Sequence, residues 1–263
     1  MNIILKNFLF FFIIFSSLNC KSQNDVVFLN YKVFYDFKRP LSRDVYMTIS
    51  DQKALYVEKN NSTVYLKNEA EFVIPDNKDD ESLYTDVSNY VIQSEYKYDD
   101  KFIVQNLVLN KLFETVQDPY FGNFISEESI ANITWNLENE FKTINEVECQ
   151  KAIGSFRGLQ WKIWFSMKYP IPFGPWKLFG APGLIFEAST LDKKVTYLLQ
   201  SIKSGNMIID DTLPKYKLMT LENLVKFMDE NSDVINDASR NYENRTKVVG
   251  YRNLLEPKYE WEE

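Results

Sequence analysis

The segment from Gly174 to Gly183 constrains the fold of this chain more than any other stretch. Its ten residues hold three of the eight glycines and two of the nine prolines. Glycine permits positive φ and proline fixes φ near about −65°, so this density specifies a rigid, sharply folded backbone. Flexible linkers are instead rich in serine, glycine and charge. We therefore expect an ordered loop that holds its aromatic residues, Trp176 and Phe179, in defined positions.

The first 22 residues have the pattern of a secretory signal peptide. Lys6 gives a short positive region, an unbroken apolar run of eight residues follows, and Ser22 suits cleavage before Gln23. The apolar run is too short to span a bilayer. The alternative is an outer-membrane lipoprotein lipidated at Cys20, although the residues before this cysteine depart from the usual lipidation pattern. We expect residues 23–263 to form a single exported domain without a membrane span, in the periplasm or at the cell surface.

Composition excludes several kinds of chemistry. Removal of the signal takes away two lysines and no acid, which moves the formal charge from −7 to −9 and argues against nucleic-acid binding. The chain has no histidine, so histidine-based nucleophile systems and nearly all zinc-type sites are excluded. Cys149 is the one cysteine of the mature chain, which rules out an internal disulfide. We expect no metal, no cofactor and no enzymatic activity.

Alternating apolar residues predict a mainly β protein of the α+β class. Residues 26–37 place six apolar side chains on one face, the period-two pattern of a half-buried strand. An antiparallel meander that forms a curved sheet or half-barrel is the expected architecture. Thr115–Ser129, with Pro119 and Gly122, fits the pattern poorly and is predicted to be a surface excursion. The other expected strands are 45–50, 54–58, 63–67, 90–98, 102–109, 135–141, 160–168, 184–188 and 195–202.

One or two helices are expected near the C-terminus. Thr220 is a suitable N-cap, and the apolar residues that follow it fall on one face at helical spacing: Leu221, Leu224, Val225 and Met228. A second short helix is expected to begin near Ser232.

Residues 147–189 resemble the GLPGLI family, a group of exported proteins found mainly in Bacteroidetes. Two departures from the family pattern are Ala181, in a leucine position, and Leu159, where many members carry a second arginine. The matching elements are Cys149-Gln150-Lys151-Ala152, Phe156-Arg157-Gly158, Trp161, Trp164-Phe165, Ile171-Pro172, Gly174-Pro175-Trp176-Lys177 and Gly180-Ala181-Pro182-Gly183-Leu184-Ile185.

The resemblance implies an exported β-rich protein whose biochemical role is not established, and it transfers no catalytic residue. The residues that it singles out are structural or contact a partner: Cys149, Arg157, Gly158, Trp161, Trp164, Pro172, Gly174, Pro175, Trp176, Lys177, Gly180, Pro182, Gly183, Leu184 and Ile185.

The Gly/Pro-rich segment has two interpretations. As a structural element it is a type II turn, with Pro182 and a positive-φ Gly183 at its centre, and Trp176 and Phe179 close one end of the core. As a binding element it presents Trp176, Lys177 and Phe179 to a partner, because tryptophan is favoured at binding hot spots.

Three further motif residues carry individual expectations. Arg157 is expected to pair with a carboxylate, Glu148 or Glu187 being the candidates, or else to bind a ligand carboxylate. Trp164 lies on the polar side of its strand, where a loop such as residues 170–180 is expected to cover it, or else it is exposed and stacks on a ligand or a partner chain. Cys149 is expected to be an inert, semi-buried thiol because no histidine can activate it.

Two functions from different classes fit these observations. The first is an exported, non-catalytic module that binds another envelope protein or a ligand. The second is a periplasmic carrier that holds a small hydrophobic ligand in an open half-barrel. A large continuous apolar cavity would favour the carrier, whereas a filled core with exposed motif aromatics would favour the partner-binding module.

Overall fold

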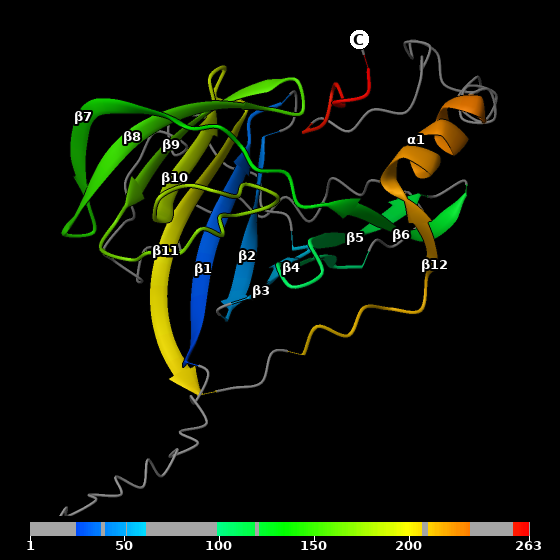
Figure 1. The fold of residues 1–263 in the computed structure, drawn as a ribbon, viewed down its shortest axis with the longest axis horizontal. Helices are drawn as coiled ribbons and strands as arrows, with labels where there is room; N and C mark the ends of the chain where they lie inside the picture. Colours follow the sequence, from blue (N-terminus) through cyan, green and yellow to red (C-terminus); the bar gives the residue numbers. More distant parts are fainter. Residues whose placement is uncertain are drawn as a thin grey trace, which may run out of the picture.

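A computed structural model describes residues 25–37, 40–50, 52–61, 99–118, 121–206, 210–231 and 255–262. Within these residues, twelve strands form one open, curved sheet, and one helix lies near the C-terminus (Figure 1). The strands are β1 Asp25–Tyr35, β2 Leu41–Ile49, β3 Lys53–Glu58, β4 Lys101–Asn106, β5 Lys111–Asp118, β6 Gly122–Ser129, β7 Asn136–Ile144, β8 Val147–Phe156, β9 Leu159–Ser166, β10 Leu184–Thr190, β11 Val195–Asn206 and β12 Lys217–Thr220.

The predicted meander is confirmed, and it occurs twice. Strands β1 to β6 pair in sequence order, as do β7 to β11, and the antiparallel pairing of β1 with β11 joins the two meanders. Strand β12 adds in parallel to β6. The mainly β fold therefore follows from the alternation of apolar residues. The expected strands at 63–67 and 90–98 and the helix near Ser232 lie outside the described residues.

Helix α1, Leu221–Glu230, begins where the sequence predicts. The Thr220 hydroxyl accepts a hydrogen bond from the Asn223 backbone N–H, and the four apolar residues of the predicted face are all buried. Its buried face packs beside the β6 end of the sheet, where Leu224 and Met228 contact Phe124. Among the described residues, no helix is long and apolar enough to cross a membrane.

The predicted surface excursion at Thr115–Ser129 is wrong. Strands β5 and β6 form a paired hairpin there, with Asp118 opposite Gly122 at its end. Polar side chains, among them Glu114 and Glu128, occupy buried or nearly buried positions on these strands and interrupt the alternation of apolar residues. The hairpin supplies two carboxylates of the site described below.

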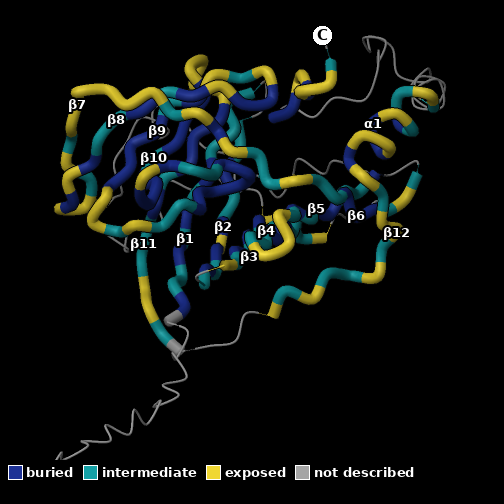
Figure 2. Tube along the Cα trace, viewed as in Figure 1, coloured by how far each residue is buried: buried dark blue, intermediate teal, exposed yellow. Residues whose placement is uncertain are grey.

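One face of the sheet, which we call the inner face, carries the main core. Register places Tyr31 opposite Val45 and Leu199, and Met47 opposite Tyr56, and these side chains are buried. Buried residues dominate the middle of the sheet, whereas β7 and the outer side of α1 are exposed (Figure 2).

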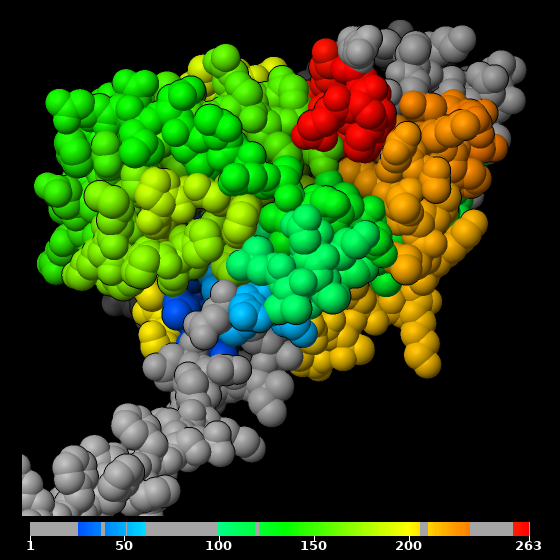
Figure 3. Space-filling model, in the orientation of Figure 1, coloured from blue at the N-terminus to red at the C-terminus, as the bar shows by residue number. Residues whose placement is uncertain are grey.

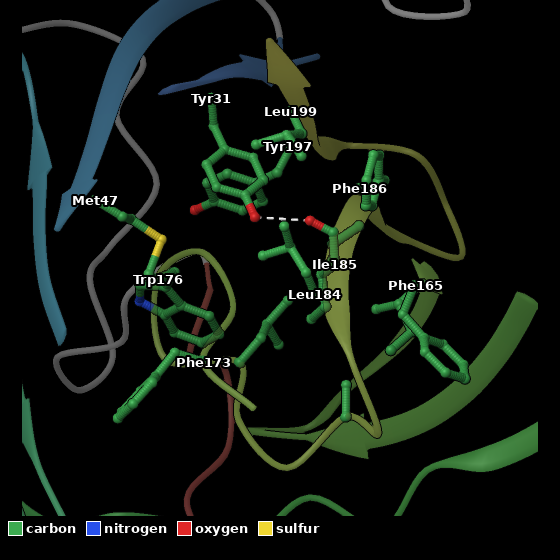
Figure 4. Close-up of a cluster of buried hydrophobic side chains, with 14 of the residues drawn as sticks. Tyr31, Met47, Phe165, Phe173, Trp176, Leu184, Ile185, Phe186, Tyr197 and Leu199 are labelled. Atoms are coloured by element: carbon green, nitrogen blue, oxygen red, sulfur yellow. Dashed lines mark hydrogen bonds between the residues drawn. The ribbon is translucent and has the colours of Figure 1, made fainter. Parts of the chain in front are cut away.

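The segment between β9 and β10, residues 167–183, carries the Gly/Pro-rich sequence and packs into this core. We call it the motif loop. Trp176, Leu178 and Phe173 of the loop are essentially fully buried. In Figure 4, Trp176 and Phe173 lie beside Leu184 and Ile185 of β10, and the Tyr31 hydroxyl donates a 2.7 Å hydrogen bond to the Ile185 carbonyl oxygen. The motif loop therefore fills this part of the inner face.

Candidate functional site

A cavity of about 300 Å³ lies between the inner face of the sheet, α1 and the C-terminal segment 255–262. In Figure 3 the C-terminal segment, in red, sits between the strands and α1, in orange. Leu221, Leu224 and Val225 of α1 give the cavity an apolar wall, and Tyr259 contributes an aromatic ring. The other walls carry six charged side chains: Arg43, Glu58, Asp99, Lys101, Glu114 and Glu256.

Glu58 is held at one side of the cavity by three donors. Its carboxylate accepts hydrogen bonds from the Tyr56 hydroxyl at 2.8 Å, the Tyr35 hydroxyl at 3.0 Å and Arg43 Nη1 at 3.0 Å. Burial raises the pKa of both tyrosines well above the ordinary value, and the negative charge of Glu58 adds to the effect. Both phenols therefore stay protonated and donate to Glu58.

Lys177 of the motif loop occupies the centre of a buried ionic cluster. Its Nζ lies 2.6 Å from Glu114, 2.7 Å from Glu128 and 2.7 Å from Glu256. Burial alone would lower the pKa of Lys177, but the surrounding carboxylates outweigh it and hold this pKa well above the ordinary value. Three carboxylates match the three N–H donors of an ammonium. Lys177 is therefore fully paired in the protein interior, where only 2% of the residue is exposed.

The same three carboxylates resemble a cation site. One oxygen from each lies within 4.8 Å of the others. Hard divalent cations prefer such oxygen ligands. The Lys177 ammonium already contacts all three, however, so a metal ion would first have to displace it. This donor set therefore fits an internal lysine and does not fit a resident metal.

Arg157 forms the other half of the cluster. It pairs with Glu128 and Glu260, and its Nε lies 3.3 Å from Glu256. The predicted partners were wrong: Glu187 pairs with Lys142 instead, and no ion pair joins Arg157 to Glu148 among the described residues. The guanidinium also lies 5.1 Å from the Tyr259 ring, a cation–π distance.

The turn between β8 and β9 explains how Arg157 reaches the cluster. Arg157 and Gly158 both have positive φ, 54° and 76°, the signature of a two-residue type I′ hairpin turn. A Cβ on Gly158 would lie 2.8 Å from Lys258 Cβ. Gly158 is therefore required both by the turn and by the close approach of the C-terminal segment.

Trp176 is also held at positive φ, 56°, and its ring is fully buried. It packs at 5.6 Å from Trp161 and 5.5 Å from Phe156, and its carbonyl oxygen accepts a 3.2 Å hydrogen bond from Gln105. Phe179 is half-buried and packs against Phe173. In this conformation neither Trp176 nor Lys177 is accessible to a partner protein.

The expected type II turn at Pro182-Gly183 is wrong, because Gly183 is not at positive φ. A Cβ there would lie 2.2 Å from the Ser166 carbonyl oxygen, so glycine is required by close backbone contact. Positive φ occurs instead at Gly180, 85°, whose N–H donates to the Pro172 carbonyl oxygen. Gly174 donates to the Leu178 carbonyl oxygen and closes the turn that begins with Pro175.

Trp164 and Cys149 lie away from the cluster. Trp164 is 6% exposed, and Lys142 of β7 lies 4.5 Å above its ring. Lys142 of β7 therefore makes the described contact with the Trp164 ring. Trp176 belongs to the loop that was expected to cover Trp164, but its ring packs against Trp161. Cys149 is fully buried, and burial raises the pKa of its thiol to about 11, which suits an unreactive side chain.

The structure thus brings Arg157, Gly158, Trp176 and Lys177 of the predicted residues to one place. The sequence analysis did not identify the acidic partners of Lys177 and Arg157, which include Glu114, Glu128 and Glu256. It also did not identify the cavity beside them, whose wall includes Glu58 and Tyr259. For Glu58, Glu114 and Glu128 one signal was present, namely glutamates at alternate positions in strands that otherwise carry apolar residues. Glu256 and Tyr259 lie in the segment 255–262, outside the strands, and had no such signal.

No protein-family profile and no curated protein matches the chain. Among solved structures, PNGF-II in its C2 crystal form has a TM-score of 0.49 and 11% identity over 76% of this chain. The chain spans about a third, 32%, of the PNGF-II chain. An uncharacterised conserved protein from Thermus thermophilus has a TM-score of 0.35 and 13% identity, covering 73% of this chain and 90% of that chain.

A putative outer membrane lipoprotein-sorting protein domain from Vibrio parahaemolyticus has a TM-score of 0.29 and 5% identity, covering 73% of this chain and 89% of that chain. At these scores the likenesses concern the path of the backbone and carry no functional conclusion.

Proposed function

We propose that this chain is an exported, non-catalytic protein of the cell envelope that binds a ligand in the cavity between the sheet and α1. The cavity carries the proposal. Its volume of about 300 Å³ lies at the lower end of the range of small-molecule sites, and it combines an apolar wall with convergent charged groups.

Export and membership of the GLPGLI family are parts of the same proposal. The signal-like first 22 residues support export, and the ordered motif elements from Cys149 to Ile185 support the family. Burial of Trp176 and Lys177 directs the binding role away from the motif loop itself. In this proposal the loop is a structural element that anchors one end of the ionic cluster.

The carrier of a hydrophobic ligand remains the alternative. An open curved sheet next to a helix is the architecture that such a carrier needs. In the described part of the chain, however, the motif loop fills part of the inner face and charged groups line much of the cavity. A polar or charged ligand therefore fits the site better than a lipid chain.

Native mass spectrometry tests the proposal. The purified mature chain is incubated with a small-molecule extract of the host envelope, and bound species are identified. Asn60 is exposed and lines the cavity, so Asn60→Trp should reduce binding with little effect on folding. Leu137→Trp, at an exposed position of β7, is the matched control and should bind normally. Equal loss in both variants, or no bound species in the unmodified chain, would reject a ligand-binding cavity.

A further inference from the structure

The charges that line the cavity do not balance. Two basic side chains, Arg43 and Lys101, face four acidic ones, Glu58, Asp99, Glu114 and Glu256, which gives a formal charge of 2 − 4 = −2. Both basic groups are already engaged, because Arg43 pairs with Glu58 at 3.0 Å and Lys101 with Glu114 at 2.5 Å. Of the other two acidic groups, Asp99 has no basic partner among the described residues, and Glu256 pairs with Lys177 and Arg157 behind the cavity.

Including the cluster behind the cavity does not remove the excess. Lys177 and Arg157 add two positive charges, and Glu128 and Glu260 add two negative charges. The joined network therefore has four basic and six acidic groups, again a formal charge of −2.

Glu256 supplies an unpaired acceptor in the wall of the cavity. Its side chain is 3% exposed, and its ion pairs with Lys177 and Arg157 both use Oε1. In the described part of the chain, Oε2 of Glu256 has no hydrogen-bond or ion-pair partner. Oε2 is not among the described buried side-chain atoms that lack a hydrogen-bond partner, so it is not sealed from the cavity and can accept a hydrogen bond from a bound donor.

Asp99 is the second carboxylate of the lining that can accept a further donor. Tyr216 donates a 3.1 Å hydrogen bond to it, but among the described residues no basic side chain pairs with it. Asp99 is exposed, and Glu256 is buried. The lining thus offers one carboxylate at the solvent side and one in the interior, next to the apolar wall from α1.

We propose that the cavity binds an organic cation, a primary ammonium or guanidinium group on a short aliphatic chain, with its charge at Glu256. The assignment rests on the ligand-binding function proposed above and names its ligand class. The alkyl chain packs on Leu224 and Val225 of α1, and the cation supplies Glu256 Oε2 with the donor that it lacks. A free amine and a lysine or arginine side chain of a peptide share this chemistry.

Proton release follows from the surroundings of Glu256. Burial raises the pKa of its carboxyl group, Glu114 and Glu128 raise it further, and Lys177 opposes them. Arg157 and Tyr259 also lie close to the cluster. A bound cation stabilises the ionised carboxylate. Binding should therefore release protons and should strengthen as pH rises through the Glu256 pKa, while an alkylammonium, with a pKa near about 10.4, stays charged.

Isothermal titration calorimetry with three probes of similar length and different charge tests the charge assignment. Pentylammonium should bind at least about tenfold more tightly than pentanol, because hydrogen bonds to charged groups exceed neutral ones by that order, and pentanoate should bind least. Titration in two buffers of different ionisation enthalpy should reveal proton release. Nα-acetyl-lysine N-methylamide is the peptide-like probe: tighter binding than pentylammonium points to a lysine side chain, and weaker binding to a free amine.

Three variants make the test specific. Glu256→Gln should weaken pentylammonium binding about tenfold or more and abolish proton release, and Asp99→Asn should weaken binding without changing proton release. Glu230→Gln, the same charge change on the exposed side of α1, should change neither. Asp99→Asn lies at an exposed position and keeps the test valid if Glu256→Gln folds poorly.

The outcomes separate the ligand class from the existence of a binding site. Equal or tighter binding of pentanol or pentanoate would overturn the cation assignment and leave a ligand-binding cavity. Failure of every probe would also overturn the cation assignment. In that case an envelope ligand lost in Asn60→Trp would still support the cavity, and absence of any such ligand would reject both.

Discussion

The Lys177 ammonium lies 2.7 Å from Glu256 Oε1 and ties the motif loop to a segment 79 residues later in the chain. Arg157 adds a second tie through Glu256 and Glu260. The family-like motif therefore fixes the C-terminal segment over the inner face, and Glu256 and Tyr259 of that segment form part of the cavity wall. The motif residues Lys177 and Arg157 therefore help to position a wall of the cavity.

Replacing Lys177 should strongly destabilise the fold. Lys177→Met leaves Glu114, Glu128 and Glu256 close together without their shared cation, and removal of one side of a buried ion pair costs about 3–5 kcal/mol. Urea unfolding measures the loss. Lys226→Met, at a position whose side chain is 71% exposed, should change the free energy of unfolding by less than about 0.5 kcal/mol. Similar values for both variants would show that the cluster contributes little.

Trp176→Ala should also reduce stability. The indole is fully buried against Trp161 and Phe156, and removal of such a ring costs about 3–5 kcal/mol. Trp261→Ala, at a position that is 42% exposed, is the control and should cost clearly less. An unchanged melting temperature for Trp176→Ala would overturn the structural role of the motif loop and restore the partner-binding interpretation.

The fold could be predicted because its signals are local. Period-two alternation located β1, and the Thr220 cap with its apolar spacing located α1. The β5–β6 hairpin was not predicted because Glu114 and Glu128 occupy positions where the alternation would place apolar residues.

The site depended on contacts between residues that are far apart in the chain. Arg157 lies 29 residues from Glu128 and 103 residues from Glu260. Nothing in the neighbourhood of Arg157 in the sequence distinguishes these partners from Glu148 or Glu187. The reason for glycine at position 183 is also a long-range contact. Ser166 on the neighbouring strand leaves no room for a Cβ there, and the local turn does not require glycine.

Two glycine substitutions should separate steric clash from backbone strain. Gly183→Ala places a Cβ 2.2 Å from the Ser166 carbonyl oxygen, so the strands must move apart. Overpacking of this kind costs typically about 1–3 kcal/mol or more. Gly122→Ala meets nothing within 4 Å, but its φ of 89° strains an L-residue by about 1 kcal/mol. Thermal unfolding should rank Gly183→Ala as the more damaging, and the reverse order would contradict the close contact at Gly183.

Stability at acid pH should depend on Glu114. Burial raises the pKa of its carboxyl group, but Lys101 and Lys177 outweigh burial and lower it from 4.5 to about 2. Because this folded-state pKa lies below the unfolded value, the unfolded chain takes up the proton first as pH falls. The contribution of Glu114 is therefore complete above about pH 4.5 and is lost between there and about pH 2, with a limiting slope of about 1.4 kcal/mol per pH unit.

Urea unfolding of the unmodified chain and of Glu114→Gln over this pH range measures that contribution. The difference in free energy of unfolding between the two proteins should shrink as pH falls from 4.5 to about 2. Glu230→Gln, on the exposed side of α1, is the matched control and should follow the unmodified chain throughout. Glu256 should show the opposite sign, because its pKa is raised and the unmodified chain loses stability relative to Glu256→Gln as pH rises above about 4.5. A pH-independent difference for Glu114→Gln would mean that Lys101 and Lys177 do not hold this carboxylate ionised in the folded state.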